Sequence, residues 1–302
     1  MSQYGKFFDF CRDSGSKFST IPVCNLFNES PARSGSSAAG FGGCDLTGIG
    51  LSNGRELANL GSILLDGIAI LVTIALLFFS NRKRAAVGRR EMQYFLFGYL
   101  VISICEIFTI GGFPLNGAVR RAFTAVHIAA VVATAWVLLL NAIVGFQIME
   151  DGTFVSMALV IGSSLAFVIG VGYIALDTAF KWTGYWDSTL SPPNRAYALY
   201  TLYLLAPLVF IAFYFILEAY LVVVILGERR PLLYLITAGL LFAIGQIFQF
   251  VISVHICNGT HGKINGGMFE SLFTLLAVVM VWVFWSSITE DDWPTAGTPG
   301  YS

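Results

Sequence analysis

The stretch 145-GFQIMEDGT-153 lies between two long apolar runs, at residues 123–148 and 154–176, and carries two carboxylates, a glycine and no Lys or Arg. Each run is long enough to cross a bilayer core of about 30 Å as a helix, which needs about 20 apolar residues. The stretch must therefore reverse the chain between two spans. Gly152 accepts the left-handed backbone that a reversal can need, and Thr153 can cap the helix that follows.

The whole chain has the composition of a membrane protein. Of its 302 residues, 56% are hydrophobic and 12% are charged, with a mean hydropathy of +0.75, whereas about 25% are charged in an ordinary soluble domain. Seven apolar stretches are long enough to span the lipid bilayer, at residues 57–79, 92–112, 123–148, 154–176, 197–226, 232–254 and 266–288. The sequence therefore predicts an all-α polytopic membrane protein with seven transmembrane helices. A net charge of −1 favours no nucleic acid partner.

The spans divide the chain into three regions. Residues 1–56 precede the first span, and we expect the opening MSQYGKFFDF to be too polar and too short for a signal peptide. This region is rich in Gly and Ser, notably at residues 34–40, which suggests a loosely folded segment. Residues 57–288 form the seven-helix transmembrane domain, and residues 289–302 form an acidic tail.

The loop cations predict the orientation of the chain. The first loop, residues 81–90, carries five cations, and the fifth loop adds Arg229 and Arg230. The opposite loops carry five in total, namely Arg120, Arg121, Lys181, Arg195 and Lys263. The excess of Lys and Arg places the first and fifth loops in the cytosol. The N-terminal region is then luminal and the acidic tail cytosolic.

The cysteines agree with this orientation. Four of the five lie on the predicted luminal side, at Cys11, Cys24, Cys44 and Cys257, and an even set in an oxidising lumen predicts two disulfides. Two glycosylation sequons, beginning at Asn28 and Asn258, lie on the same side. The sequence leaves open that the cysteines are free thiols and that neither sequon is used.

Several polar side chains fall inside the apolar runs. An ionised carboxylate in mid-membrane costs ~2.5–3.5 kcal/mol, so each should face the bundle interior and be paired or protonated. The predicted intramembrane polar network comprises Asp66, Glu106, His127, Asn141, Glu218, Gln246 and Glu270, with Gln147 and Gln249 as further partners. We favour interhelical hydrogen bonds over a proton or ion path, because basic partners are absent from the span interiors.

Catalytic and cofactor motifs are absent from the sequence. It contains no P-loop, no Gly-x-Ser-x-Gly and no HExxH, so we expect neither an enzyme nor a cofactor. His255, Cys257 and His261 have a spacing that zinc accepts, but a metal would compete with disulfide use, and we expect no metal site. The alternative to a binding protein is a seven-span small-solute or ion transporter, or a receptor, that uses Asp66, Glu106 and Glu218.

Several short stretches of the sequence follow one another in a fixed order along the chain. They are 86-AVGRREM-92, 145-GFQIMEDGT-153, Gly245-Gln246, 255-HIC-257, Phe284-Trp285 and 289-TEDD-292, preceded by Phe10-Cys11, 22-PVC-24 and 55-RELAN-59. Together they resemble the fungal chitin synthase export chaperone family over nearly the whole chain. The chain departs from that pattern at Glu106 and at residues 111–114, where the family tends to carry an aspartate and a Pro-Pro-Gly. The sequence therefore leaves open that the chain is a diverged member of this family that serves a different client.

The resemblance implies a multi-pass protein of the endoplasmic reticulum membrane that helps a chitin synthase fold and leave for the cell surface. Such a protein is needed for cell wall chitin, and escort as far as the plasma membrane is left open. Its partners would be a chitin synthase client and the export-coat machinery. The candidate partner contacts form an acidic cytosolic face of Glu150, Asp151, Glu290, Asp291 and Asp292.

Overall fold

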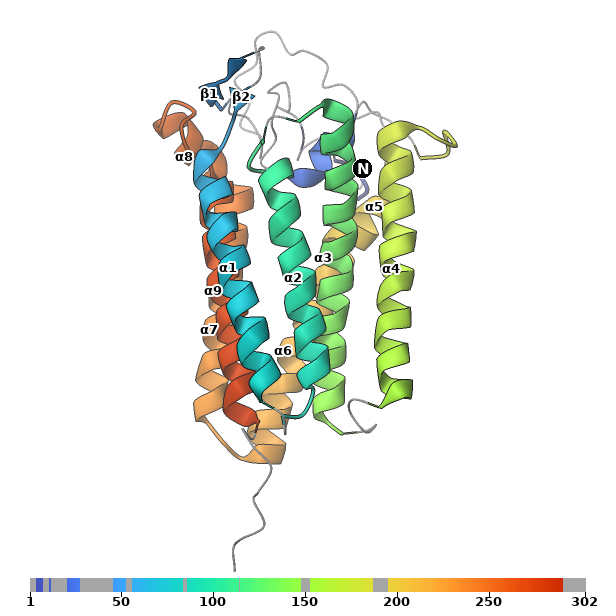
Figure 1. The fold of residues 1–302 in the computed structure, drawn as a ribbon, viewed down its shortest axis with the longest axis vertical. Coiled ribbons are helices and arrows are strands. Elements are labelled where there is room, and N and C mark those ends of the chain that lie inside the picture. The colour runs from blue at the N-terminus through green and yellow to red at the C-terminus, as the bar shows by residue number, and fades with distance from the viewer. Residues whose placement is uncertain are drawn as a thin grey trace, which may run out of the picture.

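The computed structural model describes residues 4–7, 11, 21–27, 46–52, 56–83, 86–113, 115–147, 153–186 and 195–289. Seven helical segments within these residues are long and apolar enough to cross a membrane. They are α1 (Leu60–Arg82), α2 (Arg89–Thr109), α3 (Gly117–Gly145), α4 (Phe154–Phe180), the composite segments Tyr197–Leu226 and Arg230–Gly259, and α9 (Gly266–Ile288). All seven run along the long axis of the molecule (Figure 1), which confirms the predicted fold class.

Two of the helical segments change their hydrogen-bonding pattern along their length. The fifth consists of α5 (Tyr197–Leu199), η3 (Tyr200–Leu205), α6 (Ala206–Tyr220) and η4 (Leu221–Leu226). The sixth consists of α7 (Arg230–Ile247), η5 (Phe248–Ile252) and α8 (Ser253–Gly259). Here η3, η4 and η5 are π-helical. A cause is visible for η3, because Pro207 follows it and proline supplies no N–H and crowds the carbonyl four residues earlier.

The predicted limits lie within five residues of the observed ones except at the start of the third span, which differs by six. The helix begins at Gly117 rather than near residue 123, because the Asn116 side chain accepts a hydrogen bond from the Ala118 N–H at 3.1 Å. The added turn includes Arg121, whose guanidinium lies 5.4 Å from the centre of the Phe180 ring. A cation at the membrane boundary therefore belongs to the helix and not to the loop.

Helix α3 lies at the centre of one half of the bundle. It packs against α2, α4 and α6, while α9 packs between α1 and α7 in the other half (Figure 1). The larger core cluster joins the two halves and includes Phe95, Leu138, Tyr214 and Trp285. The bundle therefore has a continuous interior in which polar side chains from different helices can meet.

Part of the N-terminal region is packed, contrary to the expectation of a loosely folded segment. The short helix η1 (Pro22–Leu26) lies against α3 and α4 (Figure 1), and Ile21, Val23 and Leu26 are at most 1% exposed. The apolar side chains of residues 21–27 drive this packing and outweigh the flexible composition of the region as a whole. The stretch at residues 34–40 lies outside the described residues.

A second contact joins the N-terminal region to the loop before α9. Strands β1 (Ile49–Gly50) and β2 (Glu56–Leu57) form a two-residue antiparallel pair. Ahead of them, the Thr47 N–H donates to the carbonyl oxygen of Gly262 at 3.0 Å. Residues that precede the first span therefore cover the same end of the bundle as η1.

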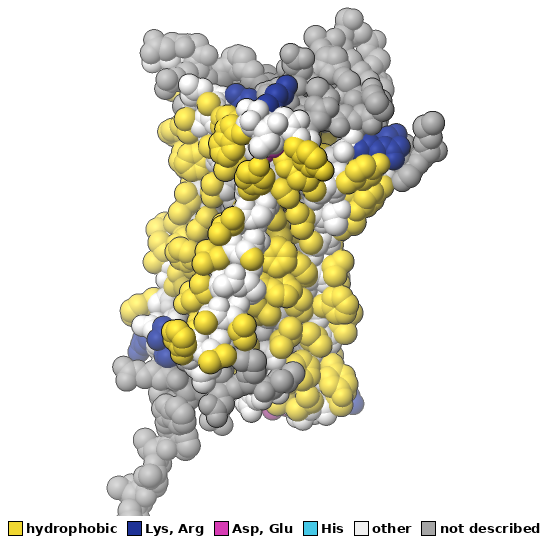
Figure 2. Space-filling model, turned by 90° about the vertical axis from the view of Figure 1, so that its right-hand side faces the viewer, with side chains coloured by type: hydrophobic (Ala, Val, Ile, Leu, Met, Phe, Trp, Pro, Cys, Tyr) yellow, Lys and Arg dark blue, Asp and Glu magenta, His cyan; other side chains and the backbone are white. Residues whose placement is uncertain are grey.

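The outer surface is consistent with a bilayer environment. Figure 2 shows one side of the molecule covered mainly by hydrophobic side chains along its height, with Lys and Arg only near its two ends. Large apolar side chains stay exposed on several helices, such as Leu71 at 69%, Ile169 at 68% and Leu233 at 65%. A surface of this size with so little charge is unusual in water and expected in lipid.

Candidate functional site

A cavity of about 360 Å³, here called the central cavity, lies among the helices and is partly open to the outside of the bundle. Residues of α2, α3, α6, α7 and α9 line it, together with residues of η3 and η5. Its polar lining includes Glu106, His127, Gln249 and Glu270, each buried in the bundle. Gln246 also lines this cavity. The structure thus brings four members of the predicted network, Glu106, His127, Gln246 and Glu270, to one site.

The polar groups of the central cavity are only partly paired. Nε2 of His127 lies 3.5 Å from Oε1 of Glu106, and the Thr274 hydroxyl donates to Oε1 of Glu270 at 2.8 Å. Nδ1 of His127 and Oε2 of Glu270 are buried and have no hydrogen-bond partner among the described residues. Unpaired groups inside a membrane domain are costly, so they mark this cavity as a candidate binding site.

Asp66 lies beside this group on α1 and is fully buried. Its carboxyl interacts electrostatically with Glu106 and Glu270, and Ser271 lies next to it. No contact of either carboxylate oxygen has the distance and angle of a hydrogen bond among the described residues. Three carboxyl groups from α1, α2 and α9 therefore share one region of the interior.

Two other members of the predicted network lie elsewhere. Asn141 and Glu218 line a smaller cavity of about 110 Å³, here called the small cavity, together with Gly88 and Trp285. The Asn141 amide donates to the Gly88 carbonyl oxygen at 3.2 Å, and Nε1 of Trp285 donates to the Val87 carbonyl oxygen at 2.9 Å. The predicted single network is therefore two separate sites.

Three of the short stretches that resemble the family meet at the small cavity. Gly88, Gly145 and Trp285 come from three of them and line the same space. Gly88 has a φ of +67°, a conformation that favours glycine, and it precedes the first residue of α2. At the other end of the bundle, Nδ2 of Asn59 donates to Oδ1 of Asn265 at 2.7 Å. These stretches hold the ends of neighbouring helices together.

The burial of two polar residues, Glu91 and Tyr214, could not be predicted from the sequence. Glu91 is fully buried in the first turn of α2, next to the cations of the first loop. Tyr214 is also fully buried on α6. Neither stands out in the sequence, because a carboxylate at a helix start and a tyrosine in an apolar run are both common.

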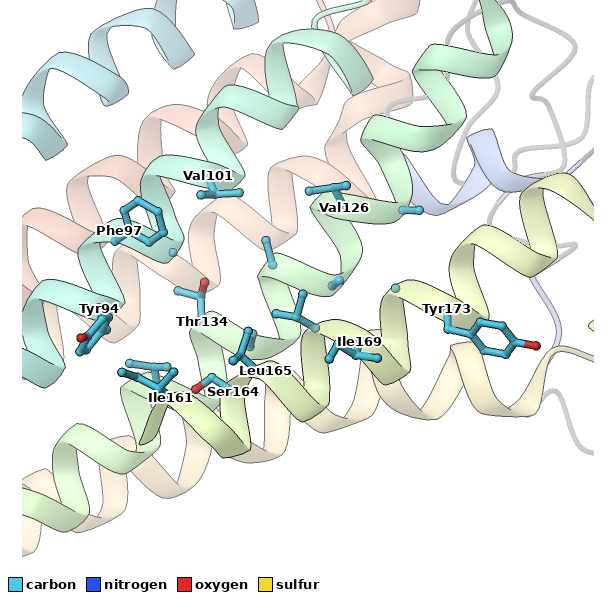
Figure 3. Close-up of a pocket in the computed structure, with 18 of the residues that line it drawn as sticks. Tyr94, Phe97, Val101, Val126, Thr134, Ile161, Ser164, Leu165, Ile169 and Tyr173 are labelled. Atoms are coloured by element: carbon cyan, nitrogen blue, oxygen red, sulfur yellow. The ribbon is translucent and has the colours of Figure 1, made fainter. Parts of the chain in front are cut away.

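A groove of about 670 Å³ lies on the outside of the bundle, between α2, α3 and α4, and is here called the α2–α4 groove. Figure 3 shows side chains of these three helices pointing into it, among them Phe97, Thr134 and Leu165. Small residues form much of its floor, at Gly98, Ala125, Ala129, Ala130, Ala133 and Gly172. Small side chains on a membrane helix permit close approach of another helix.

The glycines of this groove have different roles. A methyl group at Gly98 would overlap the side chain of Thr134, so this glycine lets α2 and α3 pack closely. A methyl group at Gly172 would lie 3.7 Å from the Ala129 side chain, which is an ordinary contact. Gly172 therefore keeps the groove open and is not required for α3 and α4 to pack.

Two of the four candidate cysteines form a disulfide with each other within the described residues. Cys11 and Cys24 are bonded, with their Cα atoms 5.4 Å apart, which confirms that these two candidates form a disulfide and gives a pairing that the sequence had left open. Cys257 is also in a disulfide, and Cys105 is a buried free cysteine. Cys44 lies outside the described residues.

The remaining predicted site residues have no role assigned by the geometry. Asn258 is exposed near the end of α8, as a glycosylation site requires. The second sequon and all five candidate partner contacts lie outside the described residues, namely Asn28, Glu150, Asp151, Glu290, Asp291 and Asp292. Their assignments stay predictions.

Seven apolar helices, carboxyl groups inside the bundle and an open groove on its outer face define a polytopic membrane protein. The family model described as chitin synthase export chaperone matches residues 3–298, and the chain belongs to this family. It is 31% identical over 290 residues to a chitin synthase export chaperone of Coccidioides immitis, covering 96% of this chain and 83% of that protein. It is 31% identical over 291 residues to one of Aspergillus fumigatus, covering 96% and 84%. A chitin synthase export chaperone of Cryptococcus neoformans is 34% identical over 226 residues, covering 74% and 61%. No solved structure matches the chain.

Proposed function

We propose that this protein is a membrane chaperone that assists the folding of a chitin synthase and its exit from the endoplasmic reticulum. Its work delivers the enzyme to the cell surface and supports cell wall chitin. The observation that carries the proposal is membership of the export chaperone family over residues 3–298. A chaperone acts by binding, and on this proposal the protein uses no catalytic step and no cofactor.

The α2–α4 groove is the surface that suits a membrane client. Its floor of small side chains and its apolar rim, with Ile161 and Ile169 exposed, offer a transmembrane helix close van der Waals contact. Lipid supplies no hydrophobic force between helices, so shape of this kind decides which helices associate. The proposed occupant is one transmembrane helix of the chitin synthase client.

Site-specific crosslinking tests this assignment. A photoreactive residue at position 169, in the groove, should crosslink to chitin synthase, whereas one at position 240, an exposed site on α7, should not. Leu240 is 60% exposed and Ile169 is 68% exposed, so both side chains are similarly accessible to a crosslinking partner. Equal yields at the two positions would mean that the groove has no special part in client binding.

The proposed orientation has the N-terminal region in the lumen and residue 302 in the cytosol. It rests on the loop cations and on the disulfide of Cys11 and Cys24, which an oxidising lumen permits. A glycosylation reporter fused after Ser302 should stay unmodified. Its modification would reverse the topology.

The acidic cytosolic face remains a further proposal. Glu150 and Asp151 would meet basic client loops or the export coat, together with the acids of residues 290–292. Replacing Glu150 and Asp151 by Ala should lower the surface fraction of the client at unchanged chaperone abundance. If abundance falls in step with export, the two carboxylates serve the turn and contact no partner.

The transporter alternative gains no specific support. It uses Asp66, Glu106 and Glu218 as one set, but Glu218 lines the small cavity and Glu106 lines the central cavity. Proton or solute flux in liposomes containing the purified protein would establish the transporter activity and contradict a purely chaperone role.

A further inference from the structure

The central cavity has a polar end and an apolar end. Glu106, His127 and Glu270 each have a partner on the same helix, eleven positions away, that also lines the cavity and is apolar: Phe95, Leu138 and Val281. Eleven residues of α-helix correspond to about 16 Å. The cavity therefore extends along the bundle from a carboxyl-containing end, near Ile21 and Pro22 of the N-terminal region, to an apolar end deeper in the membrane domain.

The central cavity is elongated along the bundle. Its volume of about 360 Å³ lies within the range of small-molecule sites. A space of this length and volume has room for a single hydrocarbon chain.

The carboxyl groups at the polar end have little basic company among the described residues. Asp66, Glu106 and Glu270 interact electrostatically, and the basic side chain that lies near them among the described residues is His127. No Lys or Arg is buried in the part of the chain that the structure describes. Carboxyl groups that share a low-dielectric site must be protonated or must receive a cation. A bound cation would balance one of them directly.

The wall of the cavity is built from irregular helix. The π-helical η3 contributes Tyr203 and Leu204, and the π-helical η5 contributes Gln249 and Phe250. Single π-turns inside α-helices occur frequently at functional sites, because they redirect side chains. Two of them facing the same cavity are consistent with a site shaped for a ligand.

We propose that the central cavity binds a small amphiphilic amine, with its ammonium head between Glu106 and Glu270 and its single alkyl chain along Leu138 and Val281. The head donates hydrogen bonds to the carboxyl oxygens, including Oε2 of Glu270, which has no partner among the described residues. The chain fills the apolar end. This binding is separate from the proposed client contact in the α2–α4 groove.

Binding to the full-length protein in lipid nanodiscs tests the proposal, with octylammonium as the probe and octan-1-ol and octanoate as matched neutral and anionic probes. Octylammonium should bind at least tenfold more tightly than octanol and should raise the melting temperature. Glu106→Gln and Glu270→Gln should each weaken octylammonium binding at least tenfold and leave octanol binding unchanged. Glu218→Gln, which lies in the small cavity, is the matched control and should bind like the wild type.

A second variant keeps the test decisive if the glutamine variants do not fold. Ala277 lines the cavity and is 5% exposed, so Ala277→Leu shortens the apolar end while every carboxyl stays in place. It should weaken octylammonium binding more than butylammonium binding. Equal binding of octanol and octylammonium, or wild-type binding by all three cavity variants, would overturn the proposal. Binding of a transmembrane peptide with one central lysine, without any binding of octylammonium, would also overturn the proposal. That result would mean that the carboxyl groups contact a partner helix.

Discussion

Nε1 of Trp285 donates a hydrogen bond to the carbonyl oxygen of Val87 across 2.9 Å and joins the end of α9 to the loop between α1 and α2. The Asn141 amide holds the next carbonyl, that of Gly88, at 3.2 Å. Helices α3 and α9 thus fix the backbone of the first loop. Both contacts line the small cavity, where three of the short stretches that resemble the family also meet.

Replacing Trp285 by Phe should destabilise the protein. The ring is 3% exposed, and the change leaves the Val87 carbonyl without its tryptophan donor, at a cost of ~1–3 kcal/mol. Thermal unfolding of the purified protein in detergent measures the loss. Trp282→Phe is the matched control, because its partner, the Ser80 hydroxyl, keeps its bond to the Leu76 carbonyl. A larger loss for Trp282→Phe would contradict the importance of the first loop.

The seven helices could be predicted because the bilayer fixes how many apolar residues a span needs. The limits of the last span, Gly266–Ile288, agree fully between sequence and structure. The division of the polar network could not be predicted, since it depends on the rotation and height of each helix. Glu106 lies near the end of α2 and Glu270 near the start of α9, at the same end of the bundle, whereas Glu218 lies toward the other end.

The α2–α4 groove could not be predicted from the sequence either. Apolar periodicity does not distinguish a face covered by lipid from one that receives another helix, because both are hydrophobic. Gly98 and Gly172 look alike in sequence and differ only in what a methyl group would meet. The packing of residues 21–27 could not be predicted either, because these few apolar side chains lie within a region of flexible composition.

Filling the α2–α4 groove should impair export of the client. Gly172→Leu places a large side chain in the groove, next to Ala129, and should reduce the fraction of chitin synthase at the cell surface several-fold. Gly170→Leu is the matched control, because Gly170 is exposed on the same helix and a side chain there meets nothing within 4 Å. Surface labelling of the client gives the measurement. An equal reduction by both variants would show that α4 tolerates no leucine and that the groove is not the cause.

Asp66 should tolerate an amide better than an alkyl group. Asp66→Asn keeps the shape and can donate to the neighbouring Glu106, whereas Asp66→Leu removes every hydrogen-bonding group from a fully buried position. The expected order of protein abundance and of client export is wild type, Asn and then Leu, with Asn close to wild type. Equal loss of export in both variants, at normal abundance, would favour a role for Asp66 as a titrating group.

The disulfides should stabilise the packed N-terminal region. Removing the Cys11–Cys24 bond by Cys11→Ser should cost ~2–4 kcal/mol of stability by the loop-entropy estimate. Cys105→Ser, at the buried free cysteine, is the control and should cost less. Peptide mapping under non-reducing conditions should also recover the Cys257 peptide bonded to one from residues 1–56. Recovery of Cys257 as a free thiol would contradict that link.

The most direct test of the chaperone proposal is the location of chitin synthase in cells that lack this protein. The fraction of the enzyme at the cell surface and the fraction in the endoplasmic reticulum are measured in the same cells, with and without the chain. The account predicts that loss of the protein retains the synthase in the reticulum and lowers cell wall chitin, while the messenger RNA of the synthase stays unchanged. It also predicts that the Gly170→Leu variant restores export and that the Gly172→Leu variant does not. A normal surface fraction of every chitin synthase in the absence of this protein would contradict the account.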